Sequence, residues 1–153
     1  MKNNFFIKLL GSGFYTGYIP FAPGTFGSLA ALLIYWFIPG FELPYVIIPL
    51  IVIFFLIGIK AGDRFEITYG KKDPSEATID EVVGMWISLL FVPKVLNYVI
   101  LSFVIWRIFD IIKPSPARNA EKLKGGLGIM LDDVIAAAYS CILVHLIIFL
   151  FVH

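Results

Sequence analysis

The chain has 153 residues, of which 59% are hydrophobic and only 15% are charged, and its mean hydropathy is +0.91. Soluble domains normally carry about 25% charged residues, so this composition indicates that lipid is the solvent of most of the chain. The net charge of +1 excludes the global basic field by which many proteins attract nucleic acid, and no nucleic-acid partner is expected.

The N-terminal part of the chain leads into the first apolar run through a loop rich in glycine and proline. Its sequence is GYIPFAPGTFGS over 17–28, with Thr25 or Ser28 available to cap the following helix. Because a helix N-terminus attracts anions, this loop is a candidate anion site. No long apolar run with a cleavage site follows Lys2 and Lys8, so the apolar segments themselves are expected to direct the chain to the membrane.

Four or five apolar segments follow this loop, at 26–41, 43–59, 82–92, 95–112 and 134–152. Crossing about 30 Å of hydrocarbon takes about 20 helical residues, a length that the last segment has and the first two approach. Segment 82–92 covers only about 16 Å as a helix, so we expect a half-helix or a re-entrant leg packed against protein. The sequence predicts an all-α protein, a polytopic membrane helical bundle that forms one integral membrane domain over 1–153, with cytoplasmic catalytic loops.

Charges at the ends of these segments predict an orientation in the membrane. The N-terminus and the regions 60–81 and 113–133 carry nearly all the basic residues, whereas Lys94 and Glu42 are left for the opposite side. By the positive-inside rule the basic regions are cytoplasmic, which requires 82–112 to enter the membrane and return. The expected location is the inner (cytoplasmic) membrane of a bacterial cell.

Two adjacent carboxylates, Asp80 and Glu81, stand where the third apolar segment begins. Thr78 and Glu81 have the spacing of a capping box, and acidic residues in a first helical turn also complement the helix dipole. Helix capping explains Asp80 less well, because one carboxylate at the cap is sufficient.

A second acidic pair, Asp132 and Asp133, precedes the last apolar segment, and either residue has the position of an N-cap. Carboxylates near a membrane boundary are costly unless they are paired or bound to metal. The two acidic pairs together therefore predict a shared site for Mg²⁺, a hard cation that binds carboxylate, water and phosphate oxygens. Asp73 and Asp110 are candidates for supporting ligands.

Basic residues surround the same regions, at Arg107, Lys113, Arg118 and Lys124. An intrahelical ion pair and anchoring at the membrane surface are the alternative explanation for these cations. That alternative fits Arg107 poorly, because Arg107 lies inside an apolar run. Arginine and lysine beside a carboxylate–metal cluster are typical of a site for a phosphate monoester. Backbone N–H groups of the glycine-rich stretch 125–128 could also approach phosphate oxygens.

Histidine and cysteine chemistry is excluded by position. His145 lies about 18 Å along a helix from Asp133, His153 is terminal, and no arginine follows Cys141 at the spacing of a cysteine phosphatase. The single cysteine also excludes an internal disulfide. A phosphatase built on this sequence must therefore use carboxylates and a metal.

Four blocks closely resemble the phosphatidylglycerophosphatase A family, in the right order and over about residues 14–138. They are the stretch 17–28, Asp73 with IDEVVGMW (79–86), RIFDIIKPSPAR (107–118) and KGGLGIMLDD (124–133). The chain departs from the family pattern at Tyr15-Thr16 and Ser115, none of which is a proposed ligand. The resemblance implies a Mg²⁺-dependent phosphatase at the cytoplasmic membrane. Its phospholipid substrate would be phosphatidylglycerophosphate, hydrolysed to phosphatidylglycerol and inorganic phosphate.

The expected roles in such a site follow from the residue types. Asp80, Glu81, Asp132 and Asp133 are expected to hold Mg²⁺ and to form the catalytic set, supported by Asp73 or Asp110. Arg107, Lys113, Arg118 and Lys124 are expected to bind phosphate, together with Gly24 and Thr25. Water activated by the metal and an aspartyl-phosphate intermediate on Asp80 or Asp132 both remain possible mechanisms.

Two other functions remain open alternatives. One is another lipid-headgroup phosphatase. The other is a small membrane transporter or ion-binding subunit without enzymatic activity, in which polar residues are expected near the membrane midplane. The apolar segments here are almost free of charge, and the acidic residues cluster at one boundary. That distribution favours the enzyme.

Overall fold

The computed structural model describes the backbone of residues 2–152 and, from Phe5 onward, their side chains. Over this range the chain forms helices and turns without a strand, which confirms the all-α prediction. The helices are α1 (Lys2–Gly11), the short 3-10 helix η1 (Thr16–Tyr18), α2 (Pro23–Phe37), α3 (Pro44–Tyr69), α4 (Ile79–Ser88), α5 (Leu96–Ile112), α6 (Ala117–Ala120) and α7 (Gly125–Val152). His153 lies outside the described residues.

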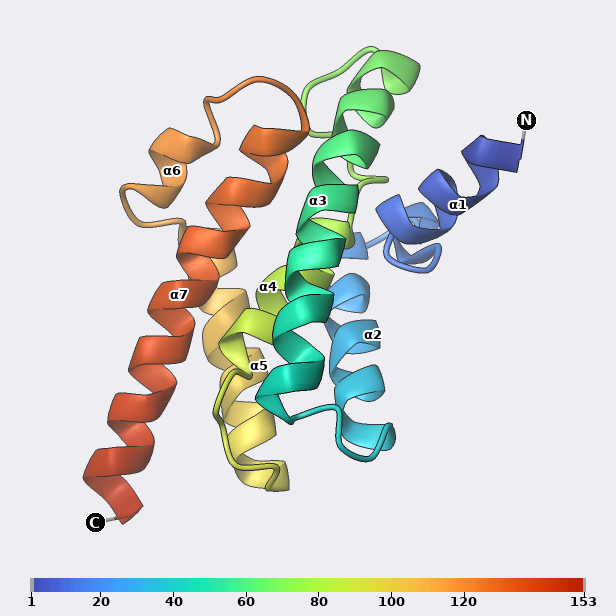
Figure 1. The fold of residues 1–153 in the computed structure, drawn as a ribbon. Coiled ribbons are helices and arrows are strands. Elements are labelled where there is room, and N and C mark those ends of the chain that lie inside the picture. Colours follow the sequence, from blue (N-terminus) through green and yellow to red (C-terminus); the bar gives the residue numbers. More distant parts are fainter. Residues whose placement is uncertain (1, 153) are drawn as a thin grey trace.

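The helices are arranged around the short helix α4, which packs against α7, α2, α3 and α5. The two longest helices, α3 and α7, run along one side of the bundle, and α1 extends away from it beside α3 (Figure 1). Nearly every side chain of α4 is buried, and the indole Nε1 of Trp86 donates a hydrogen bond to the carbonyl oxygen of Ala31 on α2 at 3.0 Å. This confirms that 82–92 contributes a short helix packed against protein.

Only two of the described helices are long and apolar enough to cross a membrane, α3 with 26 residues and α7 with 28. The predicted bundle of four to five apolar segments was therefore wrong in the number that reach spanning length. Helices α2, α4 and α5 have 15, 10 and 17 residues, so α4 covers about 15 Å. Turns that contain Pro39-Gly40 and Pro93-Lys94 end α2 and separate α4 from α5, because proline cannot continue a hydrogen-bonded helix.

The boundaries of α3 and α7 also differ from the prediction. Helix α3 continues to Tyr69, and α7 begins at Gly125, so the glycine-rich stretch is helical and not a loop. A Cβ on Gly126 would lie 1.9 Å from the backbone oxygen of Ile59, and one on Gly62 would lie 2.6 Å from the Cα of Gly126. Backbone contact between the two helices thus compensates the low helix propensity of glycine.

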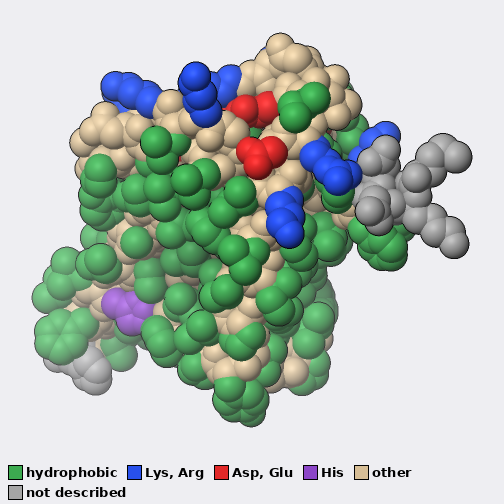
Figure 2. All heavy atoms as spheres, turned by 45° about the horizontal axis from the view of Figure 1, so that its top comes forward, with side chains coloured by type: hydrophobic (Ala, Val, Ile, Leu, Met, Phe, Trp, Pro, Cys, Tyr) green, Lys and Arg blue, Asp and Glu red, His purple; other side chains and the backbone are tan. Residues whose placement is uncertain are grey.

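Charged side chains gather at one end of the molecule, above a broad hydrophobic surface (Figure 2). The two charges predicted for the opposite side, Glu42 and Lys94, form an ion pair of 3.0 Å between the turn after α2 and the turn before α5. The structure thus brings Glu42 and Lys94 together as a pair.

Candidate active site

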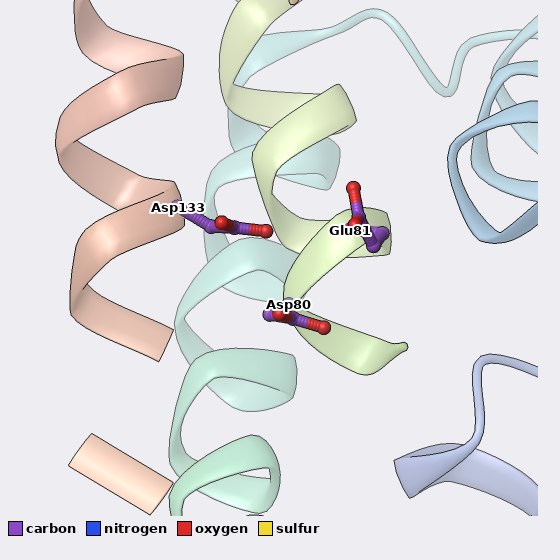
Figure 3. A group of neighbouring side chains, drawn as sticks. All are labelled: Asp80, Glu81 and Asp133. Carbon is purple, nitrogen blue, oxygen red and sulfur yellow. The ribbon is translucent and has the colours of Figure 1, made fainter. Parts of the chain in front are cut away.

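Three carboxylates from two helices converge at the charged end of the bundle. Asp80 and Glu81 project from the first turn of α4, and Asp133 projects from α7 toward them (Figure 3). One oxygen from each residue lies within 4.8 Å of the other two. Asp80 and Asp133 are buried, with 7% and 1% of their surface exposed.

Several oxygens of this three-carboxylate cluster have no hydrogen-bond partner among the described residues. They are Oδ1 of Asp80 and both side-chain oxygens of Asp133. Lys113 Nζ lies 3.5 Å from Asp133 Oδ1, close enough for an ion pair without a good hydrogen bond. Buried carboxylate oxygens without partners are costly, and such oxygens are the ligands that Mg²⁺ prefers. The donor set therefore fits a divalent cation.

The electrostatic environment of the cluster disfavours negative charge in the protein alone. Burial, followed by the neighbouring charge of Glu81, raises the pKa of Asp80 well above its usual value. Burial and then the Asp110 carboxylate raise the pKa of Glu81 to about 7, although Arg107 acts in the opposite direction. A bound cation would reverse this preference, because it would stabilise the ionised carboxylates.

Glu81 is oriented by two side chains and does not cap its helix. Arg107 Nη1 donates a hydrogen bond to Glu81 Oε2 at 2.8 Å and another to Asp110, and Ser28 Oγ donates to the same Glu81 oxygen at 3.2 Å. Thr78 makes no side-chain capping bond, and its Oγ1 lies 3.0 Å from Thr16 Oγ1. The capping-box interpretation of Glu81 was therefore wrong.

Ser28 and Trp106 form a hydrogen-bonded chain to the cluster that the sequence reasoning missed. The indole Nε1 of Trp106 donates to Ser28 Oγ at 2.9 Å. Because an indole N–H only donates, the Ser28 hydroxyl is left to donate to Glu81. Ser28 is not the helix cap considered above, since Ala22 occupies the N-cap of α2. The sequence marked Ser28 only as a candidate helix cap and as a member of the 17–28 block, and gave no sign of its contact with Glu81.

Lys113 holds the second acidic pair. Its Nζ donates to Asp132 Oδ2 at 2.6 Å, and Asp132 Oδ1 accepts the backbone N–H of Asp133 at 2.8 Å. Burial lowers the pKa of Lys113, but the nearby charges of Asp133 and Asp132 outweigh it and raise the pKa overall. Asp132 is thus engaged on both oxygens, and the three-carboxylate cluster includes only Asp133 of this pair. Since Asp132 and Asp133 lie about two turns inside α7, the N-cap interpretation of either residue was wrong.

A small cavity of about 160 Å³ opens onto the cluster. A Cβ on Gly24 would lie 2.4 Å from Glu81 Oε1, so the first turn of α2 approaches the cluster only because this position lacks a side chain. Thr25 follows in the same turn and is partly buried. The cavity is lined by Pro23, Gly24, Asp73, Pro74, Ser75, Ala77, Thr78, Asp80, Glu81 and Lys113.

The other predicted phosphate ligands lie outside this cavity. Arg118 donates to the backbone oxygen of Ile112 at 3.1 Å and lines a second, larger cavity of about 440 Å³. Lys124 is exposed in the residue before α7. Asp73 lines both cavities, and Asp110 is buried against Arg107. Of the four predicted cations, only Lys113 lines the cavity over the cluster, and Arg107 contacts the cluster through Glu81.

Comparison with known proteins places these residues in a family. A sequence model of the family described as Phosphatidylglycerophosphatase A matches residues 9–148. Proteins described as Phosphatidylglycerophosphatase A from Escherichia coli strain K12 and Haemophilus influenzae are 38% and 36% identical to the chain. These alignments cover 86% and 90% of the chain and 77% and 86% of the two relatives.

A third relative has a different description. A Bacteroides thetaiotaomicron protein described as a putative phosphatidylinositol-3-phosphatase is 45% identical over 150 residues, which cover 94% of each chain. No solved structure matches the chain.

Proposed function

The chain belongs to the phosphatidylglycerophosphatase A family and is a lipid phosphatase, and from this premise we propose that it hydrolyses phosphatidylglycerophosphate to phosphatidylglycerol and inorganic phosphate with Mg²⁺. The observation that carries the proposal is the cluster of Asp80, Glu81 and Asp133, with unpartnered buried oxygens beside Lys113. Such a cluster suits a cation that binds phosphate, and Lys113 adds a positive charge at the cavity.

The proposal is tested by measuring phosphate release from purified protein in detergent micelles that contain phosphatidylglycerophosphate. We expect release with Mg²⁺ and its loss when a chelator removes divalent ions. Release that continues unchanged with the chelator would contradict the metal site. Failure to release phosphate with any divalent ion would contradict the substrate.

A second candidate substrate comes from the relative described as a putative phosphatidylinositol-3-phosphatase, whose identity to the chain is higher at 45%. Both candidate substrates present a phosphate monoester on a phospholipid headgroup, so the same cluster suits either. Measuring kcat/KM for each lipid at equal surface concentrations in mixed micelles decides between them. We expect the larger kcat/KM for phosphatidylglycerophosphate, and the reverse ranking would assign the chain to the inositol lipid.

Each side chain has a distinct proposed role. Asp80, Glu81 and Asp133 would hold the ion, which when bound supplies Lewis-acid stabilisation of the charge on the transferring phosphoryl group. Lys113, which lines the cavity, neutralises phosphate oxygens and is itself positioned by Asp132. Arg107 acts through Glu81, and we therefore describe it as a positioning residue.

Two chemical routes fit these roles. Water attacks the terminal phosphorus and displaces the glycerol oxygen of the headgroup, or a carboxylate displaces that oxygen first and water then hydrolyses the aspartyl phosphate. Asp80 retains an unbonded oxygen whereas both oxygens of Asp132 are engaged, so the covalent route favours Asp80. Acid quenching of a single turnover with ³²P-labelled substrate separates the routes. Label that stays on the wild-type chain and is absent from Asp80→Asn indicates the covalent route.

We place the protein in the bacterial inner membrane with its charged end in the cytoplasm. Two spanning-length helices and the concentration of basic residues at one end support this placement. The test uses the cysteine-free background Cys141→Ser with one new cysteine at either end, Lys71→Cys or Tyr45→Cys. An impermeant maleimide should label Tyr45→Cys in intact spheroplasts and Lys71→Cys only after permeabilisation. The opposite labelling pattern would reverse the orientation.

Replacing Ser28 by alanine is expected to lower kcat/KM by roughly tenfold. The change removes one hydrogen bond to the Glu81 carboxylate, a bond worth about 1.5 kcal/mol or more when the acceptor is charged, and it leaves the Trp106 N–H without a partner. The matched control is Ser102→Ala, a buried serine whose hydroxyl donates within α5 to Tyr98. Equal losses of activity in the two variants would show that Ser28 has only a structural role.

A further inference from the structure

A groove between α1 and α3 is separate from the cavity over the carboxylate cluster. Its volume is about 460 Å³, and no residue that lines it also lines the cluster cavity. The apolar part of the groove is formed by Phe6, Ile7 and Leu10 of α1 and by Ile57 of α3. Phe6 is 63% exposed and Phe5 beside it is 54% exposed, so α1 presents aromatic surface that its own bundle does not cover.

Two cations stand at the polar end of the groove. Lys60 and Arg64 line it from α3, four residues apart and therefore on one helix face. Both side chains are exposed, and neither has an ion pair within the described residues. Asp63 also lines the groove, but its Oδ1 accepts the backbone N–H of Gly126 at 2.7 Å and is engaged with α7. The groove thus offers two unpaired positive charges at the edge of an apolar surface.

This combination matches an anionic phospholipid in both polarity and charge. An acyl chain is covered by apolar and aromatic side chains, and a phosphodiester is attracted to lysine and arginine at the membrane surface. Lys60 and Arg64 lie toward the end of the spanning-length helix α3 that faces the charged end of the molecule, where lipid headgroups of that leaflet would be.

We propose that the α1–α3 groove binds one anionic phospholipid of the surrounding leaflet at a site distinct from the catalytic cluster. Its phosphodiester contacts Lys60 and Arg64, and one acyl chain lies against Phe6, Ile7, Leu10 and Ile57. The inference rests on the proposed membrane location and is independent of the proposed substrate. The lipid is not hydrolysed in the groove, because Asp63 is the only carboxylate among the described residues that line it.

The site has a structural link to catalysis. Asp63 separates Lys60 from Arg64 along α3 and holds the first turn of α7 through Gly126. The same helix carries Asp132 and Asp133. A lipid in the groove therefore packs beside the hydrogen bond that fixes the start of α7.

The test is native mass spectrometry of the purified protein, released from micelles that contain dioleoyl phosphatidylglycerol or dioleoyl phosphatidylcholine. We expect the wild-type protein to retain one phosphatidylglycerol molecule. The double variant Lys60→Gln/Arg64→Gln should retain this lipid at least about tenfold more weakly than the wild type. Phe6→Ser should also weaken retention, because it removes the exposed aromatic wall. Glycerol 3-phosphate, which has no acyl chain, should not displace the lipid.

The matched control is the double variant Lys71→Gln/Lys122→Gln. It removes two positive charges from the same end of the molecule, at residues that do not line the groove. This control should retain the lipid as the wild type does. Equal retention of both lipids, unchanged retention by Lys60→Gln/Arg64→Gln, or an equal loss in the control would overturn the proposal. Thermal unfolding in lipid-free detergent verifies that each variant is folded. The experiment measures lipid binding, so a protein that is inactive on phosphatidylglycerophosphate could still bind the lipid. The proposed activity and the proposed lipid site can therefore be contradicted independently.

Discussion

Replacing Asp133 by asparagine should lower kcat/KM by about a thousandfold while leaving the metal-free protein as stable as the wild type or more stable. The loss corresponds to about 4 kcal/mol of transition-state stabilisation, the scale expected when one element of a preorganised charged site is removed. The opposite effect on stability follows because both Asp133 side-chain oxygens are buried without a hydrogen bond among the described residues. Lys113 lies 3.5 Å from Asp133 but keeps its closer ion pair with Asp132, at 2.6 Å, so no cation is left uncompensated. A residue that served only the fold would lower activity and stability together.

The measurements for Asp133→Asn are phosphate release with Mg²⁺ and thermal unfolding in chelator. Added Mg²⁺ should raise the unfolding temperature of the wild type and have little effect on the variant, since a ligand stabilises the state that binds it. The control is Glu42→Gln, which alters a carboxylate ion-paired with Lys94 away from the cluster. Full activity in Asp133→Asn would remove Asp133 from the metal site. An equal rise in unfolding temperature with Mg²⁺ in the wild type and in Asp133→Asn would do the same.

Replacing Lys113 by glutamine is expected to lower both activity and stability. Lys113 is the cation that pairs with Asp132 and Asp133, whose side chains are 2% and 1% exposed. Removing one partner of a buried ion pair costs about 3–5 kcal/mol, because the remaining charge is left uncompensated. Activity should fall as well, by roughly a hundredfold or more, since Lys113 is the only cation among the described residues that line the cavity.

The double variant Lys113→Gln/Asp132→Asn separates these two effects. It removes the charge that Lys113→Gln leaves uncompensated on Asp132, so most of the stability should return while activity stays low. The more exposed pair of Lys94 and Glu42 is the reference, and Lys94→Gln should cost about 1 kcal/mol or less. Recovery of activity in the double variant would show that Lys113 supports the fold and does not bind phosphate.

The carboxylate cluster could be predicted from the sequence because its signal is local. Asp80 and Glu81 are adjacent acids at the start of an apolar run, and the same is true of Asp132 and Asp133. Both acids of the first pair join the cluster but only one acid of the second pair does, and this difference depends on helix rotation. Adjacent side chains on a helix point about 100° apart, and in α7 only Asp133 is directed at α4 whereas Asp132 meets Lys113.

The all-α class of the fold could be predicted from the sequence, but the boundaries of its helices could not. Apolar runs identified the helices, but the start of α7 depends on the backbone contact of Gly126 with α3, which is a tertiary feature. Arg118 and Lys124 were grouped with the phosphate ligands because they are close in sequence. The turn that follows Lys113 places both away from the cluster cavity. Ser28 and Trp106 lie far apart along the chain, so their hydrogen bond could not be foreseen.

The contact between α3 and α7 at Gly62 and Gly126 determines how closely α7, which carries Asp133, packs against α3. A Cβ at Gly62 or Gly126 would collide with the facing backbone, so any larger residue at either position would push α7 away from α3. Asp133 lies seven residues beyond Gly126, about two turns and 10 Å along the same rigid rod. The position of Asp133 relative to Asp80 and Glu81 therefore depends on two glycines that carry no functional group.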